Sequence, residues 1–237
     1  REKLGGLQFK DTTYRYPEAD LDTLRGINLV INEGEKIAIL GRNGSGKSTL
    51  MKLASGLFKA SDGLVMYDGV DIRQLHTDDL SRSVGIVLQD VQLFSGSVRE
   101  NITMGRKGIS QEDLVEAGKL SGLDEFISKI PGGYDLQLSD GGKGLSGGQR
   151  QSIALARAIV HKPSHFILDE PTSAMDMNAE NLFIHQVGSI LQNSTMLIVT
   201  HRMPLLNLVD RIIVMNEGQI VEDGPKDEII KKLNQNP

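Results

Sequence analysis

The feature that most constrains this chain is the segment 41–49, which reads Gly-Arg-Asn-Gly-Ser-Gly-Lys-Ser-Thr. It directly follows the apolar segment 36–40, a predicted strand. The segment after it has apolar residues at helical spacing: Leu50, Leu53, Ala54 and Leu57. Such a glycine-rich loop between a strand and a helix turns its backbone N–H groups toward a phosphate, and the helix N-terminus adds the positive end of its dipole. The sequence therefore predicts an α/β fold with a nucleotide-binding phosphate loop.

We expect this loop to bind ATP and Mg²⁺. Lys47 provides a compact positive charge for the β- and γ-phosphates, and the Ser48 hydroxyl is suited to ligate Mg²⁺. The other residues of the loop that we expect to bind the nucleotide are Gly41, Asn43, Gly44, Ser45, Gly46 and Thr49.

A second motif lies at the end of another apolar strand. Segment 166–168 reads Phe-Ile-Leu and is followed by Asp169 and Glu170. A carboxylate in this position can hold Mg²⁺ through water, and a second acid beside it can orient or deprotonate an attacking water. A solvated acid pair at a strand end is the simpler alternative, but the phosphate loop in the same chain favours a metal-binding Asp169 and a catalytic Glu170.

Strands and helices alternate along the chain, which predicts a mostly parallel sheet with helices on both faces. The expected strands of this core are 36–40, 83–88, 165–168 and 195–199, and the expected helices are 149–160 and 178–191. A hairpin over 212–222 and a helix over 226–233 follow. Between about 90 and 150, polar helices at 111–120 and 123–129 predict a helical lobe inserted into a single domain, 1–237.

Composition excludes several other classes of protein. The chain has 26 Lys+Arg and 31 Asp+Glu, a net charge of −5, so it lacks the basic excess of a dedicated nucleic-acid-binding domain. It has no cysteine, which excludes disulfides, thiolate zinc sites and cysteine nucleophiles. No apolar run approaches the roughly 20 residues of a membrane-spanning helix. Because the sequence does not begin with Met, we expect it to be a piece of a longer protein.

The pentapeptide Leu-Ser-Gly-Gly-Gln at 145–149 resembles the signature of the ATP-binding cassette (ABC) ATPases. The resemblance extends over essentially the whole chain, and it implies an antiparallel β subdomain beside the parallel core and the helical lobe. It also implies roles for single residues. Tyr16 resembles the aromatic residue that stacks on adenine, although packing alone is the simpler interpretation of a tyrosine. Gln89 resembles the glutamine that senses Mg²⁺ and the transport domain, and His201 resembles the switch histidine, both with catalytic roles.

The same resemblance implies a dimer. Ser146, Gly147, Gly148 and Gln149 lie at the start of a predicted helix, where a hydroxyl, backbone donors and the helix dipole form a second anion site. In the family, the signature of one copy closes on the phosphate loop of another, head to tail, around two ATP molecules. Segment 173–176, which ends in Asp176, resembles the loop that accompanies this contact.

Three further segments resemble exporters. The stretch 89–102 is similar to the exporter segment that contacts a coupling helix of the membrane domain. Segments 171–176 and 200–206 are most like the ATPase domain of type I secretion exporters of RTX-type proteins or peptides. This implies a transmembrane domain on the same polypeptide, a periplasmic adaptor and an outer-membrane channel as partners, and a place at the cytoplasmic face of the bacterial inner membrane.

Other members of the family remain alternatives. A lipid or multidrug exporter shares most of these motifs. A soluble ABC ATPase of translation or DNA repair typically has two cassettes or a long coiled-coil insertion, and the chain has neither. An importer subunit would usually add a C-terminal regulatory domain. A nucleotide-binding regulator without turnover is disfavoured because Glu170 and His201 are both present.

Overall fold

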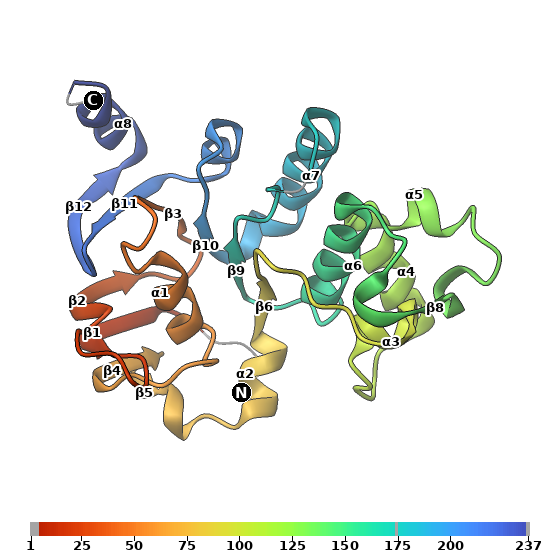
Figure 1. Cartoon of the computed structure of the whole chain (residues 1–237), viewed down its shortest axis with the longest axis horizontal. Helices are drawn as coiled ribbons and strands as arrows, with labels where there is room; N and C mark the ends of the chain where they lie inside the picture. Colours follow the sequence, from red (N-terminus) through yellow and green to blue (C-terminus); the bar gives the residue numbers. More distant parts are fainter. Residues whose placement is uncertain (1–4, 174, 236–237) are drawn as a thin grey trace.

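A six-stranded sheet forms the centre of the computed structural model, which describes residues 5–173 and 175–235 (Figure 1). The strand order is β12-β11-β3-β10-β9-β6. The strands are β3 (Lys36–Gly41), β6 (Val84–Val87), β9 (His165–Asp169), β10 (Thr195–Val199), β11 (Arg211–Asn216) and β12 (Gln219–Pro225). All neighbouring pairs are parallel except β11 and β12, which form an antiparallel hairpin. The mostly parallel core therefore has one antiparallel edge.

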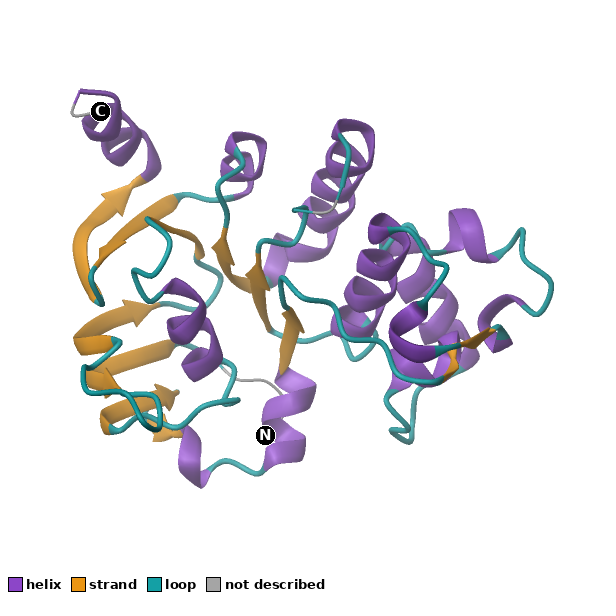
Figure 2. Cartoon of the chain, viewed as in Figure 1, coloured by secondary structure: helices purple, strands orange, loops and turns teal. Residues whose placement is uncertain are grey.

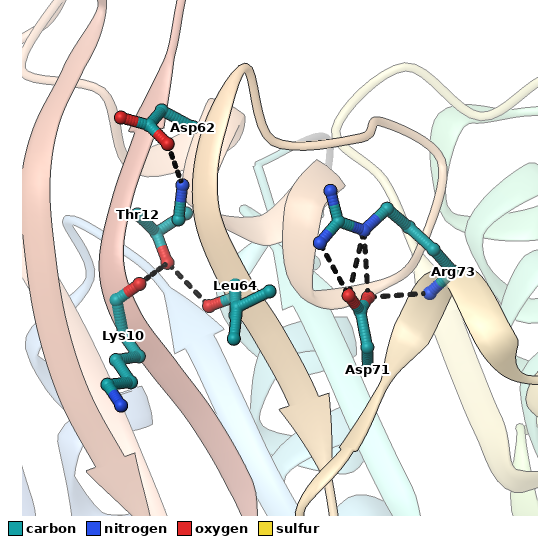
Figure 3. Close-up of polar contacts among 7 residues, drawn as sticks. Lys10, Thr12, Asp62, Leu64, Asp71 and Arg73 are labelled. Carbon is teal, nitrogen blue, oxygen red and sulfur yellow. Dashed lines mark hydrogen bonds and ion pairs between the residues drawn. The ribbon is translucent and has the colours of Figure 1, made fainter.

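A second, antiparallel sheet lies on one side of the core, with the order β2-β1-β4-β5. Its strands are β1 (Leu7–Tyr14), β2 (Leu24–Ile31), β4 (Asp62–Tyr67) and β5 (Val70–Asp71). Strands β1 and β4 shift register after Lys10, and there the Thr12 hydroxyl donates a 2.7 Å hydrogen bond to the carbonyl oxygen of Leu64 (Figure 3). Just after β5, Arg73 forms an ion pair with Asp71. The first contact joins β1 to β4, and the second lies where β5 ends.

Helix α1 (Lys47–Ala54) is packed between the two sheets (Figure 1). Its Leu50 and Leu53 are fully buried in a cluster that joins residues of both sheets. The alternation of side chains along β3 explains the arrangement, since Ile37 and Ile39 face this cluster while Ala38 belongs to a cluster on the opposite face. Strand β3, which leads into the phosphate loop, is thus packed on both faces, and α1 after the loop lies in one of the two cores.

Helices cover the other face of the central sheet (Figure 2). They are α6 (Gly147–Ile159), which packs on β6, and α7 (Met177–Ile190). Residues of the predicted helical lobe form α3 (Val98–Thr103), α4 (Gln111–Leu120), α5 (Asp124–Ile127), the β7–β8 pair (Gly96–Ser97 with Gln137–Leu138) and the start of α6. Helix α8 (Lys226–Gln235) follows β12. None of the described helices is long and apolar enough to cross a membrane.

Two local expectations differ from the structure. Leu57 does not belong to α1, which ends at Ala54, and its side chain is 55% exposed. Gly56 has φ +75°, a left-handed conformation that ends the helical path before Leu57. Helix α2 (Thr77–Ser83) was not expected, because none of its residues is buried and its sequence has no apolar stripe.

Candidate functional site

A cavity of about 660 Å³ lies beside the phosphate loop, where β9 and β10 end. The carboxyl ends of parallel strands meet at one edge of a sheet, and ligands of α/β proteins bind there. The predicted residues that line the cavity are Tyr16, Asn43, Gly44, Gly46, Lys47, Ser48, Thr49, Gln89, Asp169, Glu170 and His201. Thr23 and Val199 also line it and were not predicted. Thr23 has a short polar side chain and Val199 an apolar one, and neither residue belongs to a motif.

The ammonium group of Lys47 is bound by its own loop. It donates hydrogen bonds to the carbonyl oxygens of Gly41, at 2.8 Å, and Arg42, at 2.9 Å. Burial lowers the pKa of Lys47, against the opposing charges of Glu170 and Asp169. The loop is therefore a preformed cradle with a desolvated cation in it, an arrangement that suits a polyanion.

Two predicted loop residues lie behind the cavity wall. The Ser45 side chain is buried and does not line the cavity. Gly41 lies against β11, where an added Cβ would be 2.3 Å from the carbonyl oxygen of Met215. Both residues shape the loop from within, since the Gly218 N–H also donates to the Ser45 carbonyl at 3.1 Å.

Gly46 caps the N-terminus of α1 in a conformation that other residues rarely adopt. Its φ is +99°, and an added Cβ would be 2.6 Å from Cδ2 of Leu24. Gly44 has φ +81°, but nothing lies within 4 Å of the position of its Cβ. Glycine is thus needed at 44 for its backbone, and at 46 for its backbone and for space.

The two acids at the end of β9 are both largely desolvated. Asp169 is 4% exposed, and burial raises its pKa against a hydrogen bond from Ser48 and the charge of Lys47. Its Oδ1 atom accepts no hydrogen bond from the described residues. Oδ1 is therefore a buried acceptor that is open to a hydrogen bond or a metal ion from outside the chain.

Glu170 directly follows β9 and adopts φ +47°, which is strained for a residue with a side chain. Its N–H donates to the carbonyl oxygen of Val199 at 2.9 Å, and its own carbonyl accepts from the Ser173 N–H at 3.1 Å. Its Oε1 lies 3.4 Å from Nε2 of His201. Burial raises the pKa of Glu170, with the His201 charge as the main opposing influence. A carboxylate held in this way is suited to accept a proton from water.

The oxygen donors at this end of the cavity fit Mg²⁺. The Ser48 hydroxyl, the Asp169 carboxylate and the Gln89 amide are hard ligands, and all three residues line the cavity. Within the described ranges, no group of three or more His, Asp or Glu side chains could hold a metal ion by itself. Mg²⁺ is usually bound through one or two carboxylates together with phosphate oxygens and waters.

Tyr16 forms part of the cavity wall at the end nearest the antiparallel sheet. Its ring lies edge-on to Tyr14, with centroids 5.0 Å apart, and to Phe58, at 5.7 Å. Its hydroxyl is 3.1 Å from Oγ1 of Thr49. The tyrosine is thus both a packed residue and a cavity residue.

The predicted signature residues lie apart from this cavity. Ser146 is the exposed N-cap of α6, and its Oγ accepts from the Gln149 N–H at 3.2 Å while Gln149 Oε1 accepts from the Ser146 N–H at 2.8 Å. Gly147 and Gly148 form the first turn, and none of these four residues lines the cavity. In a single chain, the start of α6 is therefore separate from the cavity at the phosphate loop.

Asp176 also lies outside the cavity lining. It caps α7, where its Oδ1 accepts a 2.9 Å hydrogen bond from the Ala179 N–H. Ser173, from the same predicted loop, does line the cavity, whereas Ala174 lies outside the described residues.

Fold and site together define a P-loop nucleotide-binding protein of the α/β class, as the sequence predicted. The family model of the ABC transporter matches residues 24–173. The chain belongs to the ABC transporter family, whose ATP-binding proteins are ATPases.

The chain is similar to ATP-binding proteins of bacterial toxin export. The leukotoxin export ATP-binding protein LtxB of Aggregatibacter actinomycetemcomitans is 44% identical over 96% of this chain, and the cyclolysin secretion/processing ATP-binding protein CyaB of Bordetella pertussis is 41% identical over 95%. The leukotoxin translocation ATP-binding protein LktB of Mannheimia haemolytica is 41% identical over 97%. The chain spans 32% of the length of each.

A solved structure has the same fold. A bacterial Atm1-family ABC exporter with ATP bound superimposes with a TM-score of 0.88 and 30% sequence identity, over 97% of this chain and 40% of that chain. The predicted resemblance to ABC exporters, and to the secretion exporters in particular, is confirmed by these matches.

Proposed function

We propose that this chain is the ATP-hydrolysing motor domain of an ABC exporter that secretes a protein or peptide. The observation that carries the proposal is the convergence of Lys47, Asp169, Glu170 and His201 on one cavity at the phosphate loop. Lys47 and the loop N–H groups bind the phosphates of ATP, and Tyr16 stacks on the adenine. Asp169, Ser48 and Gln89 would hold Mg²⁺, which would supply positive charge to the phosphates.

Glu170 is the general base in this proposal. Its raised pKa moves it toward the proton affinity that a base needs near neutral pH, and the carboxylate is already shielded from bulk solvent. His201, at 3.4 Å, orients the carboxylate and stabilises its charged form. A water that gives a proton to Glu170 then attacks the γ-phosphate, the bond from the γ-phosphorus to the bridging oxygen of ADP breaks, and ADP and inorganic phosphate are the products.

The second anion site leads us to propose an ATP-dependent, head-to-tail homodimer. The exposed Ser146 cap and the open backbone at Gly148, where an added Cβ would meet only Ser146 Oγ at 4.0 Å, leave room for a phosphate from outside the chain. A two-fold arrangement would close each cap on the partner's phosphate loop and enclose two ATP molecules. In such a dimer, Asp176 and residues 146–149 complete the partner's site.

A groove of about 480 Å³ supports contact with a membrane domain. It lies between α2, β6, α3 and α6. Directly after Gln89, which lines the ATP cavity, the groove is lined by Asp90, Val91, Gln92 and Phe94. Asn101 fixes that segment, since its Oδ1 accepts from the Phe94 N–H at 2.8 Å. Phe94 and Met104 leave apolar surface at the groove, with exposures of 51% and 43%. Because Gln89 directly precedes these groove residues in the chain, a movement of Gln89 would also move them.

The remaining parts of the proposal follow from the relatives. Their names refer to the export of leukotoxins and cyclolysin, and the chain spans about a third of their length. We infer a transmembrane domain on the same full-length protein, a periplasmic adaptor and an outer-membrane channel, with this domain at the cytoplasmic face of a bacterial inner membrane. Export of a lipid or drug is the second candidate, favoured by the structural likeness to the Atm1-family exporter.

The test is the Glu170→Gln variant, measured for phosphate release from Mg-ATP and for ATP binding by calorimetry. The loss of a positioned base should lower turnover roughly 10²–10⁴-fold. Binding should persist, and ATP should increase the dimer fraction on a sizing column. The same substitution at the surface, Glu222→Gln, is the control and should leave turnover unchanged, because Glu222 does not line the cavity. Turnover equal to the unmodified chain in Glu170→Gln would reject the base assignment.

A further inference from the structure

A buried carboxylate outside the ATP cavity is tied to the loop that carries His201. Glu180 lies in the first turn of α7, and its side chain is 6% exposed. Its Oε1 accepts a 2.8 Å hydrogen bond from the Thr172 hydroxyl and lies 3.3 Å from Nη1 of Arg202. A buried charge persists only when it is paired, so this carboxylate holds the Arg202 guanidinium in place.

The same guanidinium reaches the segment after Glu170. Its Nη2 donates to the carbonyl oxygens of Ser173 and Met175, each at 3.4 Å. The backbone N–H of Arg202 donates to Oγ1 of the fully buried Thr200 at 3.0 Å. His201 therefore lies between two anchored residues, while its own side chain is 54% exposed.

We propose that Arg202, paired with Glu180, is a positioning residue for ATP hydrolysis: it fixes the His201 loop to the backbone of Ser173 and Met175 and so keeps His201 beside Glu170. A displacement of Ser173 and Met175 would move Arg202 and, with it, the histidine. The inference rests on the roles proposed above for Glu170 and His201. An arginine can make these contacts because one nitrogen of its planar guanidinium faces the Glu180 carboxylate while the other donates to the two backbone carbonyls. A lysine has a single nitrogen and cannot reproduce this geometry.

The experiment compares Arg202→Ala, Arg202→Lys and Glu180→Gln in the 237-residue chain. A misplaced histidine should lower kcat about tenfold in Arg202→Ala, with the Kd for ATP unchanged because Arg202 does not line the cavity. Arg202→Lys should recover part of the loss. Glu180→Gln keeps an acceptor for the Thr172 hydroxyl but removes the ionic partner of Arg202, so it should lower kcat as well.

Arg211→Ala is the matched control. Arg211 is also a half-buried arginine, and it lies 3.1 Å from Glu35 and 2.7 Å from Asp223, far along the sheet from the His201 loop. Arg211→Ala should lower the melting temperature as much as Arg202→Ala does. At temperatures below thermal unfolding, however, it should leave kcat unchanged. Because Arg202 and Glu180 act as one unit, the double variant Arg202→Ala/Glu180→Gln should lose no more kcat than the worse single variant.

Histidine-ring NMR signals give a readout that does not require turnover. The chain has five histidines, and the His201 signals are those missing in His201→Ala. They should shift or broaden in Arg202→Ala and stay unchanged in Arg211→Ala. Unchanged ring signals in Arg202→Ala, or a kcat loss no larger than in Arg211→Ala, would overturn the proposal. If Glu170→Gln retained turnover, the base assignment would fail, and the ring signals would still decide the role of Arg202. If Arg202→Ala does not fold, Arg202→Lys and Glu180→Gln provide the same comparison.

Discussion

At the scale of single residues, the ATP cavity holds charges that burial disfavours. Burial lowers the pKa of Lys47 and raises those of Asp169 and Glu170, so desolvation opposes the charged form of each. In Asp169, one buried oxygen also lacks a hydrogen-bond partner in the described part of the chain. The free domain is thus less stable than it could be, because these groups are arranged for a ligand and not for each other.

Asp169→Asn should raise the melting temperature of the nucleotide-free chain at pH 7. The folded pKa of Asp169 lies above its unfolded value, so this residue contributes stability at low pH and loses that contribution as the pH rises through the folded pKa. An asparagine amide does not ionise, so the variant does not lose stability as the pH rises. The difference in melting temperature between the variant and the unmodified chain should vanish in acid, where Asp169 is protonated. Thermal unfolding followed by circular dichroism from pH 3 to 8 measures it.

Asp135→Asn is the control for this measurement. Arg99, at 2.9 Å, lowers the pKa of Asp135, so its contribution is present at neutral pH and is lost as the pH falls. At pH 7 the two substitutions should therefore change the melting temperature in opposite directions, although the effect of the exposed Asp135 pair should be small. A lower melting temperature for Asp169→Asn at pH 7 would contradict the electrostatic interpretation.

Lys47→Ala should weaken ATP binding by about 10–100-fold, the size of a lost hydrogen bond to a charged group. Calorimetric titration with Mg-ATP measures the change. Lys52→Ala, which removes a lysine of the same helix from outside the cavity lining, is the control and should bind ATP as the unmodified chain does. Equal affinities for the two variants would show that Lys47 does not contact the phosphates.

At the scale of elements, the strand-loop-helix unit of β3 and α1 could be predicted and several of its neighbours could not. The glycine loop identifies both flanking elements because its chemistry needs a strand before it and a helix after it. Helix α2 carries no comparable signal, since Leu80 is its single apolar residue. Likewise, cavity residues inside motifs were found, whereas Thr23 and Val199 line the cavity through tertiary packing that no local pattern encodes.

Gly46→Ala and Gly44→Ala should differ in cost although both place a side chain at positive φ. Each incurs left-handed strain of about 1–2 kcal/mol, but at 46 the new Cβ also collides with Leu24 on β2. Gly46→Ala should therefore unfold at clearly lower urea concentration than Gly44→Ala. Equal midpoints in urea titrations would show that the contact between the loop and the antiparallel sheet does not restrict position 46.

At the scale of the whole molecule, the phosphate loop and the signature cap lie in different parts of one chain, on α1 and α6 (Figure 1). The cap is satisfied by its own capping box, yet it remains exposed. This separation is consistent with the expectation, implied by the family resemblance, that catalysis requires two chains. The residues around 146–149 do not by themselves indicate which phosphate they would contact.

A mixture of Lys47→Ala and Ser146→Arg chains should regain activity that neither variant has alone. In a head-to-tail dimer of one chain of each kind, one site combines both defects and the other combines two intact halves. A 1:1 mixture should reach about a quarter of the unmodified turnover if chains pair at random and the sites act independently. Phosphate release from the mixture and from each variant at equal total protein measures this. No gain on mixing would contradict the shared site.

The backbone of Glu170 has a consequence for how this domain could be improved in the laboratory. At φ +47° glycine would be unstrained, and the segment from Asp169 to Ser173 would keep its backbone hydrogen bonds without the glutamate side chain. A selection for heat resistance alone would therefore reward the loss of the residue that we propose as the base. Any stabilised version of this domain has to be selected for turnover at the same time.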